Sequence, residues 1–508
     1  MKTRTIVCIL CLTLPFKLCA QTAVPPLPED PAPAPVVAPA STPTVSNEEQ
    51  RLRIIRYGTD TEIANLIKTL RGESAETGKE NPLDGELLAL AEKTKNRSIL
   101  SGIFGYFGDT EKKGLEKRAQ LAIEDRDYEA SETVNAAIDY LGKVRASGMR
   151  DTLKDILNGE ESRFLSGAIR SLGKIPEEEA AAETAEYLVD YYTSRDPGDE
   201  NRRLIIGALG DLKAKQGTAF LVSIAENEDE RPPLRMTALE SLAKIADPLG
   251  LSAVITAVSS RDPNVRSSAV GALGPFSGGE AEDAIIEAFR DSYYRTRIAA
   301  AKAAGERKLS AAVPFLRFRA ENDDVPQVRD EAVKAIGVIG GTDSEQILRD
   351  LFKERKNSDR IRINAGEMLL TQSSTDHVSD VIIELDEAKT KNQTALYNGF
   401  LRILGGAKSP KLEDLVKRFF AGGGVVEKSY ALDICLNNNF QSLAGEIRKL
   451  ADPKNGSLSR KSLALLEKWG LPVNVPDSPT EETAGTAANA GTAAPPAPGS
   501  SGAAGSTQ

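Results

Sequence analysis

Apolar residues recur at every third or fourth position through most of the 508-residue chain, and this spacing places them on one face of an α-helix. Between residues 262 and 274 the shared face consists of Val265, Ala269, Ala272 and Leu273. Asp262 suits the N-cap of this helix, and Gly274 suits a left-handed cap at its end. A second amphipathic stretch follows. The pattern therefore predicts a pair of helices, at about 263–274 and 280–290.

This helix pair is a repeating unit. In three clear copies an arginine stands seven residues before an apolar anchor, as Arg266 does before Leu273. The same register gives the anchors Ile54, Phe104, Leu141, Leu172, Leu209, Leu242, Leu273, Ala304, Ile336, Leu369, Leu401, Ile434 and Leu466. Eleven of the twelve intervals are 31–37 residues long, and the first is 50, which indicates an insertion at residues 72–96. Because one pair cannot bury its apolar face alone, we expect about thirteen pairs to stack into a continuous ribbon.

Three short motifs stand within the units: Asp-Pro-x-Val-Arg at 262–266, Ala-Leu-Gly at 208–210 and again at 272–274, and Ala-Val-Pro-Phe-Leu at 312–316. In these motifs and in its period, the sequence resembles the HEAT and HEAT-like (phycobilisome-lyase-type) repeat family over about residues 48–470. The resemblance implies an all-α fold, an α-solenoid in which antiparallel helix pairs form a right-handed superhelix. It also implies that the second helices line a concave surface that holds protein partners. It implies no reaction, because one fold carries many functions.

Residues 1–20 have the pattern of a signal peptide. Two basic residues precede the apolar run 6–14, and the bond between Ala20 and Gln21 is the expected cleavage site. This run is too short to cross a bilayer core of roughly 30 Å, so we expect export rather than a permanent membrane span. The alternative is a lipid anchor on Cys19, which is less favoured because a charged residue lies close before it.

The composition of the two ends differs from that of the repeat. Residues 21–47 are dense in proline, which favours an extended, disordered linker. Residues 471–508 consist mostly of Ala, Gly, Pro, Ser and Thr, with too few large apolar residues to bury a core. We therefore expect a solenoid at residues 48–470 between a linker and a disordered tail.

The charge and the cysteine content narrow the range of functions that the chain could have. The chain has 64 Lys+Arg, 74 Asp+Glu and one His, a net charge of -10, and cleavage after Ala20 would remove three cations and leave -13. These numbers exclude a His-rich metal site and disfavour a protein that binds nucleic-acid backbones. Charge is also segregated: residues 151–260 hold 20 acidic and 12 basic residues, whereas residues 389–468 hold 14 basic and 7 acidic ones. Cys435, the single thiol that cleavage would leave, lies in an apolar run that predicts a buried, inert side chain.

Two groups of side chains are candidates for binding. Arginines recur at intervals of 31–33 residues and would stack into a ladder: Arg266, Arg297, Arg329 and Arg362. We expect this ladder to pair with acidic residues of its own or adjacent turns, with an anion-binding stripe as the alternative. The second group is the aromatic pairs Tyr191, Tyr192, Tyr293 and Tyr294, for which core packing is favoured and contact with a partner is the alternative. His377 is expected to be an exposed loop or cap residue.

Outside the predicted signal peptide the sequence contains no Cys-x-x-Cys pair, and it contains no His-Glu-x-x-His motif, phosphate-binding loop or nucleophile elbow. We therefore predict a non-catalytic scaffold of the periplasm or cell envelope that binds a protein partner along its concave helices and uses no cofactor. One alternative is an accessory, lyase-like subunit of an enzyme complex. A nucleic-acid-binding protein of the HEAT-like kind is a second alternative, which the negative charge disfavours.

Overall fold

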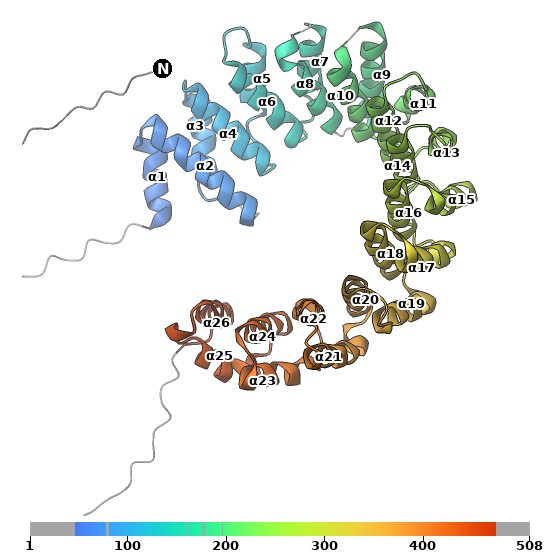
Figure 1. Cartoon of the computed structure of the whole chain (residues 1–508). Coiled ribbons are helices and arrows are strands. Elements are labelled where there is room, and N and C mark those ends of the chain that lie inside the picture. The colour runs from blue at the N-terminus through green and yellow to red at the C-terminus, as the bar shows by residue number, and fades with distance from the viewer. Residues whose placement is uncertain (1–45, 78–80, 160, 176–177, 196, 474–508) are drawn as a thin grey trace, which may run out of the picture.

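The computed structural model describes residues 46–77, 81–159, 161–175, 178–195 and 197–473. These residues form 26 α-helices and no strand, so the prediction of an all-α solenoid is confirmed. The helices follow one another around an arc, and the first helices face the last ones across its opening (Figure 1). The predicted signal peptide, residues 1–20, lies outside the described residues, as do residues 21–45 of the predicted linker and 474–508 of the predicted tail.

The helices alternate between an outer and an inner layer of the arc (Figure 1). The odd-numbered helices form the outer layer: α1 Asn47–Tyr57, α3 Asp84–Lys93, α5 Glu116–Glu124, α7 Arg150–Asn158, α9 Glu178–Ser194, α11 Thr218–Glu226, α13 Leu251–Val258, α15 Gly279–Glu287, α17 Val313–Asn322, α19 Gly341–Lys353, α21 Ser374–Thr390, α23 Leu412–Gly422 and α25 Ala444–Leu450. The even-numbered helices form the inner layer: α2 Asp60–Thr77, α4 Arg97–Asp109, α6 Ser131–Lys143, α8 Ser162–Lys174, α10 Gly198–Leu212, α12 Pro232–Ile245, α14 Pro263–Ala272, α16 Tyr294–Glu306, α18 Pro326–Ile339, α20 Asp359–Gln372, α22 Thr394–Gly406, α24 Val425–Asn438 and α26 Ser457–Lys468. Six short 3-10 helices lie between them: η1 Lys215–Gly217, η2 Pro248–Gly250, η3 Ala288–Arg290, η4 Ser310–Ala312, η5 Gln441–Leu443 and η6 Pro453–Asn455.

Each outer helix pairs with the inner helix that follows it. The sequence predicted that 263–274 and 280–290 form one pair, but α14 packs on α13 rather than on α15, so this pairing was wrong by one helix. The helix that carries the Asp-Pro-x-Val-Arg motif is therefore the second of its pair, and it lies in the inner layer (Figure 1). With this correction, the expectation that second helices line the concave side agrees with the structure.

The turn after α14 also differs from its prediction. Asp262 is the N-cap, as expected, and its carboxylate accepts hydrogen bonds of 2.7 and 3.2 Å from two N–H groups of the first turn. The helix ends at Ala272, two residues early. The left-handed glycine of this turn is Gly278, with φ of 113°, and not Gly274. The connection to α15 is thus longer than a single capping turn.

The insertion predicted at residues 72–96 is absent. Residues 60–77 belong to α2, and α3 with α4 forms a regular pair. The 50-residue interval arose because the anchor Ile54 lies on the outer helix α1. The other anchors lie on inner helices or, for Leu273, at the C-cap of the inner helix α14. The fully buried Leu70 of α2 lies 34 residues before Phe104, so the repeat continues without interruption.

Successive inner helices approach each other at small residues. A Cβ atom on Gly173 would lie 2.8 Å from the Cα of Ala208 on the next inner helix. A Cβ atom on Gly210 would lie 2.6 Å from the hydroxyl of Ser241. Both distances are below van der Waals contact, so only glycine fits where these inner helices cross. The apolar residue followed by glycine, a recurrent pattern in the sequence, therefore marks helix crossings.

The buried apolar side chains form one cluster that runs from Ile55 to Leu466. Stacked repeats are expected to share a core in this way, since each pair covers the apolar face of its neighbours. In the part of the chain that the structure describes, no helix is both long and apolar enough to cross a membrane.

Candidate functional site

The inner helices together present one surface toward the centre of the arc (Figure 1). Ion pairs link neighbouring inner helices along it: Arg71 and Lys143 to Asp109, Lys244 to Asp211, Arg360 to Asp330, Arg402 to Glu367, and Lys461 to Asp433. Most of these side chains are partly exposed, and each such pair contributes at most about 1 kcal/mol to stability. These ion pairs could not be predicted from the sequence, because the partners stand 28–38 residues apart and no local motif connects them.

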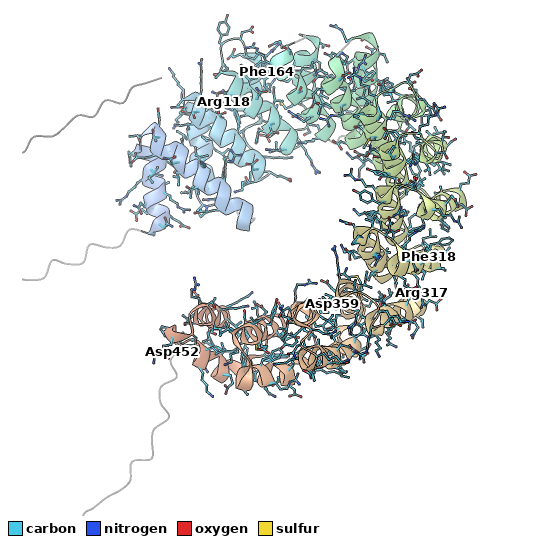
Figure 2. The ribbon with its side chains drawn as sticks, in the orientation of Figure 1. Arg118, Phe164, Arg317, Phe318, Asp359 and Asp452 are labelled. Carbon is cyan, nitrogen blue, oxygen red and sulfur yellow. The ribbon has the colours of Figure 1, made fainter. Side chains whose placement is uncertain are left out.

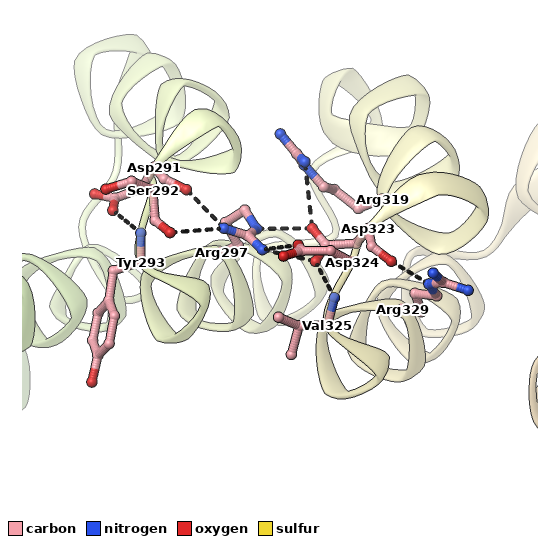
Figure 3. A network of polar contacts seen from close by, with 9 residues as sticks. All are labelled: Asp291, Ser292, Tyr293, Arg297, Arg319, Asp323, Asp324, Val325 and Arg329. Atoms are coloured by element: carbon pink, nitrogen blue, oxygen red, sulfur yellow. Dashed lines mark hydrogen bonds and ion pairs between the residues drawn. The ribbon is translucent and has the colours of Figure 1, made fainter.

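Arg297 on α16 makes the largest set of hydrogen bonds in the arginine ladder (Figure 3). Its Nε and Nη2 atoms donate two parallel hydrogen bonds of 2.8 Å to the carboxylate of Asp323. Nη2 also reaches Asp324 at 2.9 Å, and Nη1 donates to the main-chain carbonyls of Asp291 and Ser292 at 3.0 and 3.2 Å. All three guanidinium nitrogens are therefore engaged, and the side chain is only 7% exposed. Arg297 joins the loop before its own helix to the loop of the next pair.

The carboxyl partner of Arg297 is held in its ionised form. Burial alone would raise the pKa of Asp323, but hydrogen bonds from Arg297 and from the Val325 N–H lower it below its ordinary value. The hydrogen bonds from Arg297 also raise the pKa of its guanidinium. Asp323 is fully buried, so this pair is a buried, bidentate salt bridge.

Arg266 has a similar environment to Arg297. It donates to both carboxylate oxygens of Asp291 at 2.8 and 3.1 Å and to the carbonyl of Ser260 at 3.0 Å. Asp291 is thus shared, since its carboxylate pairs with Arg266 while its carbonyl accepts from Arg297. The ladder links consecutive repeats through the loops that lead from an outer to an inner helix.

The other two predicted members of the ladder, Arg362 and Arg329, make fewer hydrogen bonds than Arg297 and Arg266. Arg362 pairs with Glu384 at 2.6 Å and donates to the carbonyl of Phe352 at 3.0 Å, whereas Arg329 donates to the carbonyl of Asp323. The sequence analysis missed a further member, Arg235 on α12. This arginine precedes Arg266 by 31 residues, is buried and donates to the carbonyl of Ala225 at 3.0 Å. The seven-residue spacing to the anchor Leu242 was the signal that could have identified it.

The paired tyrosines divide between core and surface. Tyr191 is buried, so it packs in the core and cannot meet a partner. Tyr192 is partly exposed, with its ring edge-on to Phe220 at 4.9 Å between centroids. Tyr293 and Tyr294 are also partly exposed and pack edge-on to each other at 5.4 Å. For these three rings, contact with a partner stays a prediction.

The prediction that His377 is an exposed residue was wrong. The side chain is 2% exposed on α21, and its Nε2 lies 3.4 Å from a carboxylate oxygen of Glu345 on α19. The helix begins at Ser374, close to where its sequence suggested, but the fourth residue of the first turn faces the neighbouring outer helix instead of solvent. Cys435 on α24 is a buried free thiol, and burial raises its pKa to about 12. Among the described residues no three or more His, Cys, Asp or Glu side chains group in a way that could hold a metal ion.

Comparison with known proteins identifies a family. The model of the family described as "Spirochaete HEAT repeat protein" matches residues 55–465. No curated protein matches the chain. Among solved structures, Kap121p bound to Pho4p aligns at 12% identity with a TM-score of 0.42, over 83% of this chain and 53% of that one. Kap121p bound to RanGTP aligns at 12% identity with a TM-score of 0.37, over 85% of this chain and 51% of that one. The chain thus spans about half the length of these solved chains.

The family match covers most of the chain and nearly all of the helices described above, from within α1 to within α26. The chain therefore belongs to the Spirochaete HEAT repeat protein family.

Proposed function

We propose that the chain is a non-catalytic scaffold that holds a protein partner along the inner face of its arc. The observation that carries this proposal is the unbroken row of inner helices from α2 to α26, which presents one extended surface (Figure 1). Solenoids of stacked repeats use such concave surfaces for binding. The apolar cluster fills the interior of the ribbon. The side chains of the inner helices that point away from this interior therefore remain available for contact.

We also infer that this scaffold works in the periplasm or at the cell envelope. The support is the amino-terminal sequence, with its basic start, short apolar run and Ala20-Gln21 junction. Mass spectrometry of the protein from its native cells tests this inference. A mature chain that begins at Gln21 supports export, and one that begins at a lipidated Cys19 supports membrane anchoring. A chain that keeps its first twenty residues would contradict export.

A site-specific photocrosslinker distinguishes the inner face from the outer one. It would replace Gln327 on α18 or Asn398 on α22, both exposed on inner helices, and as matched controls Gln346 on α19 or Lys417 on α23, exposed on outer helices. We expect one and the same partner to be captured from both inner positions and from neither outer position. Capture from the outer positions alone, or equally from all four, would overturn the proposed use of the inner face.

A further inference from the structure

A basic pocket lies where three consecutive inner helices end. It has a volume of about 560 Å³, and its walls carry four cations, Lys143, Arg145, Lys174 and Lys213, against two carboxylates. The cations come from the ends of α6, α8 and α10 and from the loops that directly follow them. Residues 151–260, to which the last two belong, carry a net negative charge, so the pocket has the opposite sign to the segment around it.

Three of these cations have no acidic partner. Arg145, Lys174 and Lys213 are exposed, and none pairs with a carboxylate within the described ranges. Lys143 does pair, with Asp109 at 2.8 Å and Asp139 at 2.6 Å. Cations near a helix C-terminus interact favourably with its partial negative charge, and Lys143 and Arg145 both lie at the end of α6.

The backbone beneath two of the cations is unusual. Arg145 and Lys213 have φ of 52° and 55°, in the left-handed region that L side chains rarely adopt and that glycine normally fills at helix ends. Their long basic side chains are thus kept at positions where the backbone itself would favour glycine. The same conformation recurs after other inner helices, at Glu111, Ala246 and Lys308, so it belongs to the turn of the repeat and makes glycine the matched replacement at these positions.

The floor of the pocket contains glycine for a different reason. Cβ atoms on Gly142 and Gly173 would lie 2.5 and 2.8 Å from atoms of the next inner helix, so only glycine fits at both positions. The pocket is therefore lined there by the backbone of closely crossing helices.

We infer that this pocket binds an acidic segment of a partner protein, a run of Asp and Glu side chains in extended conformation. The inference rests on the proposed scaffold function and adds a site and a partner chemistry to it. Cations from three successive repeats match a chain of carboxylates better than a single compact anion. Compact phosphate sites are usually built from the free N–H groups of helix N-termini, whereas the helices here present their C-termini.

A peptide-binding assay tests this site. The probe is fluorescein-labelled decaglutamate, its anisotropy is measured with the full chain at about 50 mM NaCl, and decaglutamine is the uncharged control. We expect decaglutamate alone to bind. The Arg145→Gly and Lys213→Gly variants should each weaken binding by about threefold or more, and the double variant by about tenfold. Because glycine suits the left-handed conformation, the melting temperature of each variant should equal or exceed that of the unaltered chain.

Lys308→Gly is the matched control. Lys308 is also an exposed lysine with φ of 51° after an inner helix, α16, but it lies outside the pocket. Its replacement should leave decaglutamate binding unchanged. Equal affinities of the Lys308→Gly variant and the Arg145→Gly/Lys213→Gly double variant would overturn the inference. So would absence of binding, or displacement of the peptide by tripolyphosphate at equal charge concentration, which would make the site one for phosphate compounds. None of these results bears on the face from which the partner is crosslinked, so failure here leaves the scaffold proposal standing.

Discussion

Replacement of Arg297 by methionine should destabilise the middle of the solenoid strongly. Methionine fills much of the volume of the arginine stem but donates no hydrogen bond. The change leaves the Asp323 carboxylate, which is fully buried, with the Val325 N–H at 3.0 Å and Arg319 at 3.4 Å as its remaining donors. Removing one partner of a buried pair costs about 3–5 kcal/mol, because the other charge stays buried with its compensation reduced, here to these two weaker contacts. We therefore expect a loss of about 3–5 kcal/mol in the free energy of unfolding of the repeats around α16–α18.

Hydrogen exchange followed by mass spectrometry is the suitable assay. A repeat array need not unfold in one step, so a single melting temperature would not localise the effect. A loss of about 3 kcal/mol corresponds to a fall of about a hundredfold in the protection of the most stable amides of α16 and α18. The matched control is Arg317→Met on the outer side of α17 (Figure 2). Arg317 is 43% exposed and pairs with Glu321, so its loss should cost less than about 1 kcal/mol.

The pair can also be dissected from its acidic side. Asp323→Asn combined with Arg297→Met removes the uncompensated charge, while the asparagine can still accept from the Val325 N–H. The double variant should therefore be more stable than Arg297→Met alone. If Arg297→Met is no more harmful than Arg317→Met, or if the double variant is less stable than the single one, the structural role argued for the ladder is wrong.

Three further predictions follow from packing and burial. Gly210→Val should destabilise the chain by about 1–3 kcal/mol or more in chemical denaturation, because a side chain there collides with the next inner helix, whereas Gly271→Ala, with open space around it, should be neutral or stabilising. Cys435, whose pKa burial raises to about 12, should not react with a thiol reagent at pH 8 until the chain is unfolded by denaturant, and rapid labelling of the native protein would contradict its burial. Hydrogen bonds, first among them that from Lys389, lower the pKa of Glu427 to about 2, so its contribution to stability should be present above about pH 4.5 and disappear as the pH falls toward 2. The melting temperatures of the unaltered chain and Glu427→Gln should accordingly converge over that interval, and a constant difference would contradict the shift.

The sequence predicted the length of the repeat better than it predicted which helices pair with each other. Helical spacing and a repeat of 31–37 residues lead directly to stacked pairs, and the 26 helices among the described residues make thirteen of them. Pairing was ambiguous, because in an alternating series each helix has a neighbour on both sides, and no local signal states which neighbour shares its core. The error at α14 came from this ambiguity. The misplaced Ile54 and the insertion predicted from it arose because the outer helix α1 carries a similar apolar pattern.

The candidate sites were predictable only where they recur with the repeat. The arginine ladder has a fixed offset from the anchors, and the same rule would have added Arg235. His377 was misjudged because residues before it resemble a helix start, and which way the first turn faces depends on α19. The basic pocket has no sequence period: Arg145, Lys174 and Lys213 stand 29 and 39 residues apart and come together only through the stacking of three helices.

The curvature of the arc follows from where the small residues lie. Inner helices contact each other extensively, and several of their crossings require glycine opposite alanine or serine, as at Gly173 and Ala208. Outer helices contact each other much less. Larger side chains lie between them, such as Phe315 on α17, whose ring stacks on that of Phe289 at 6.1 Å between centroids. Phe318 on the same helix is exposed on the outer side (Figure 2). Each repeat is therefore narrower on the inside than on the outside, and a stack of such wedges must bend toward its inner helices. Gly142 and Gly173, which stand at two of these crossings, also line the basic pocket, so the pocket lies directly against the contacts that bend the ribbon.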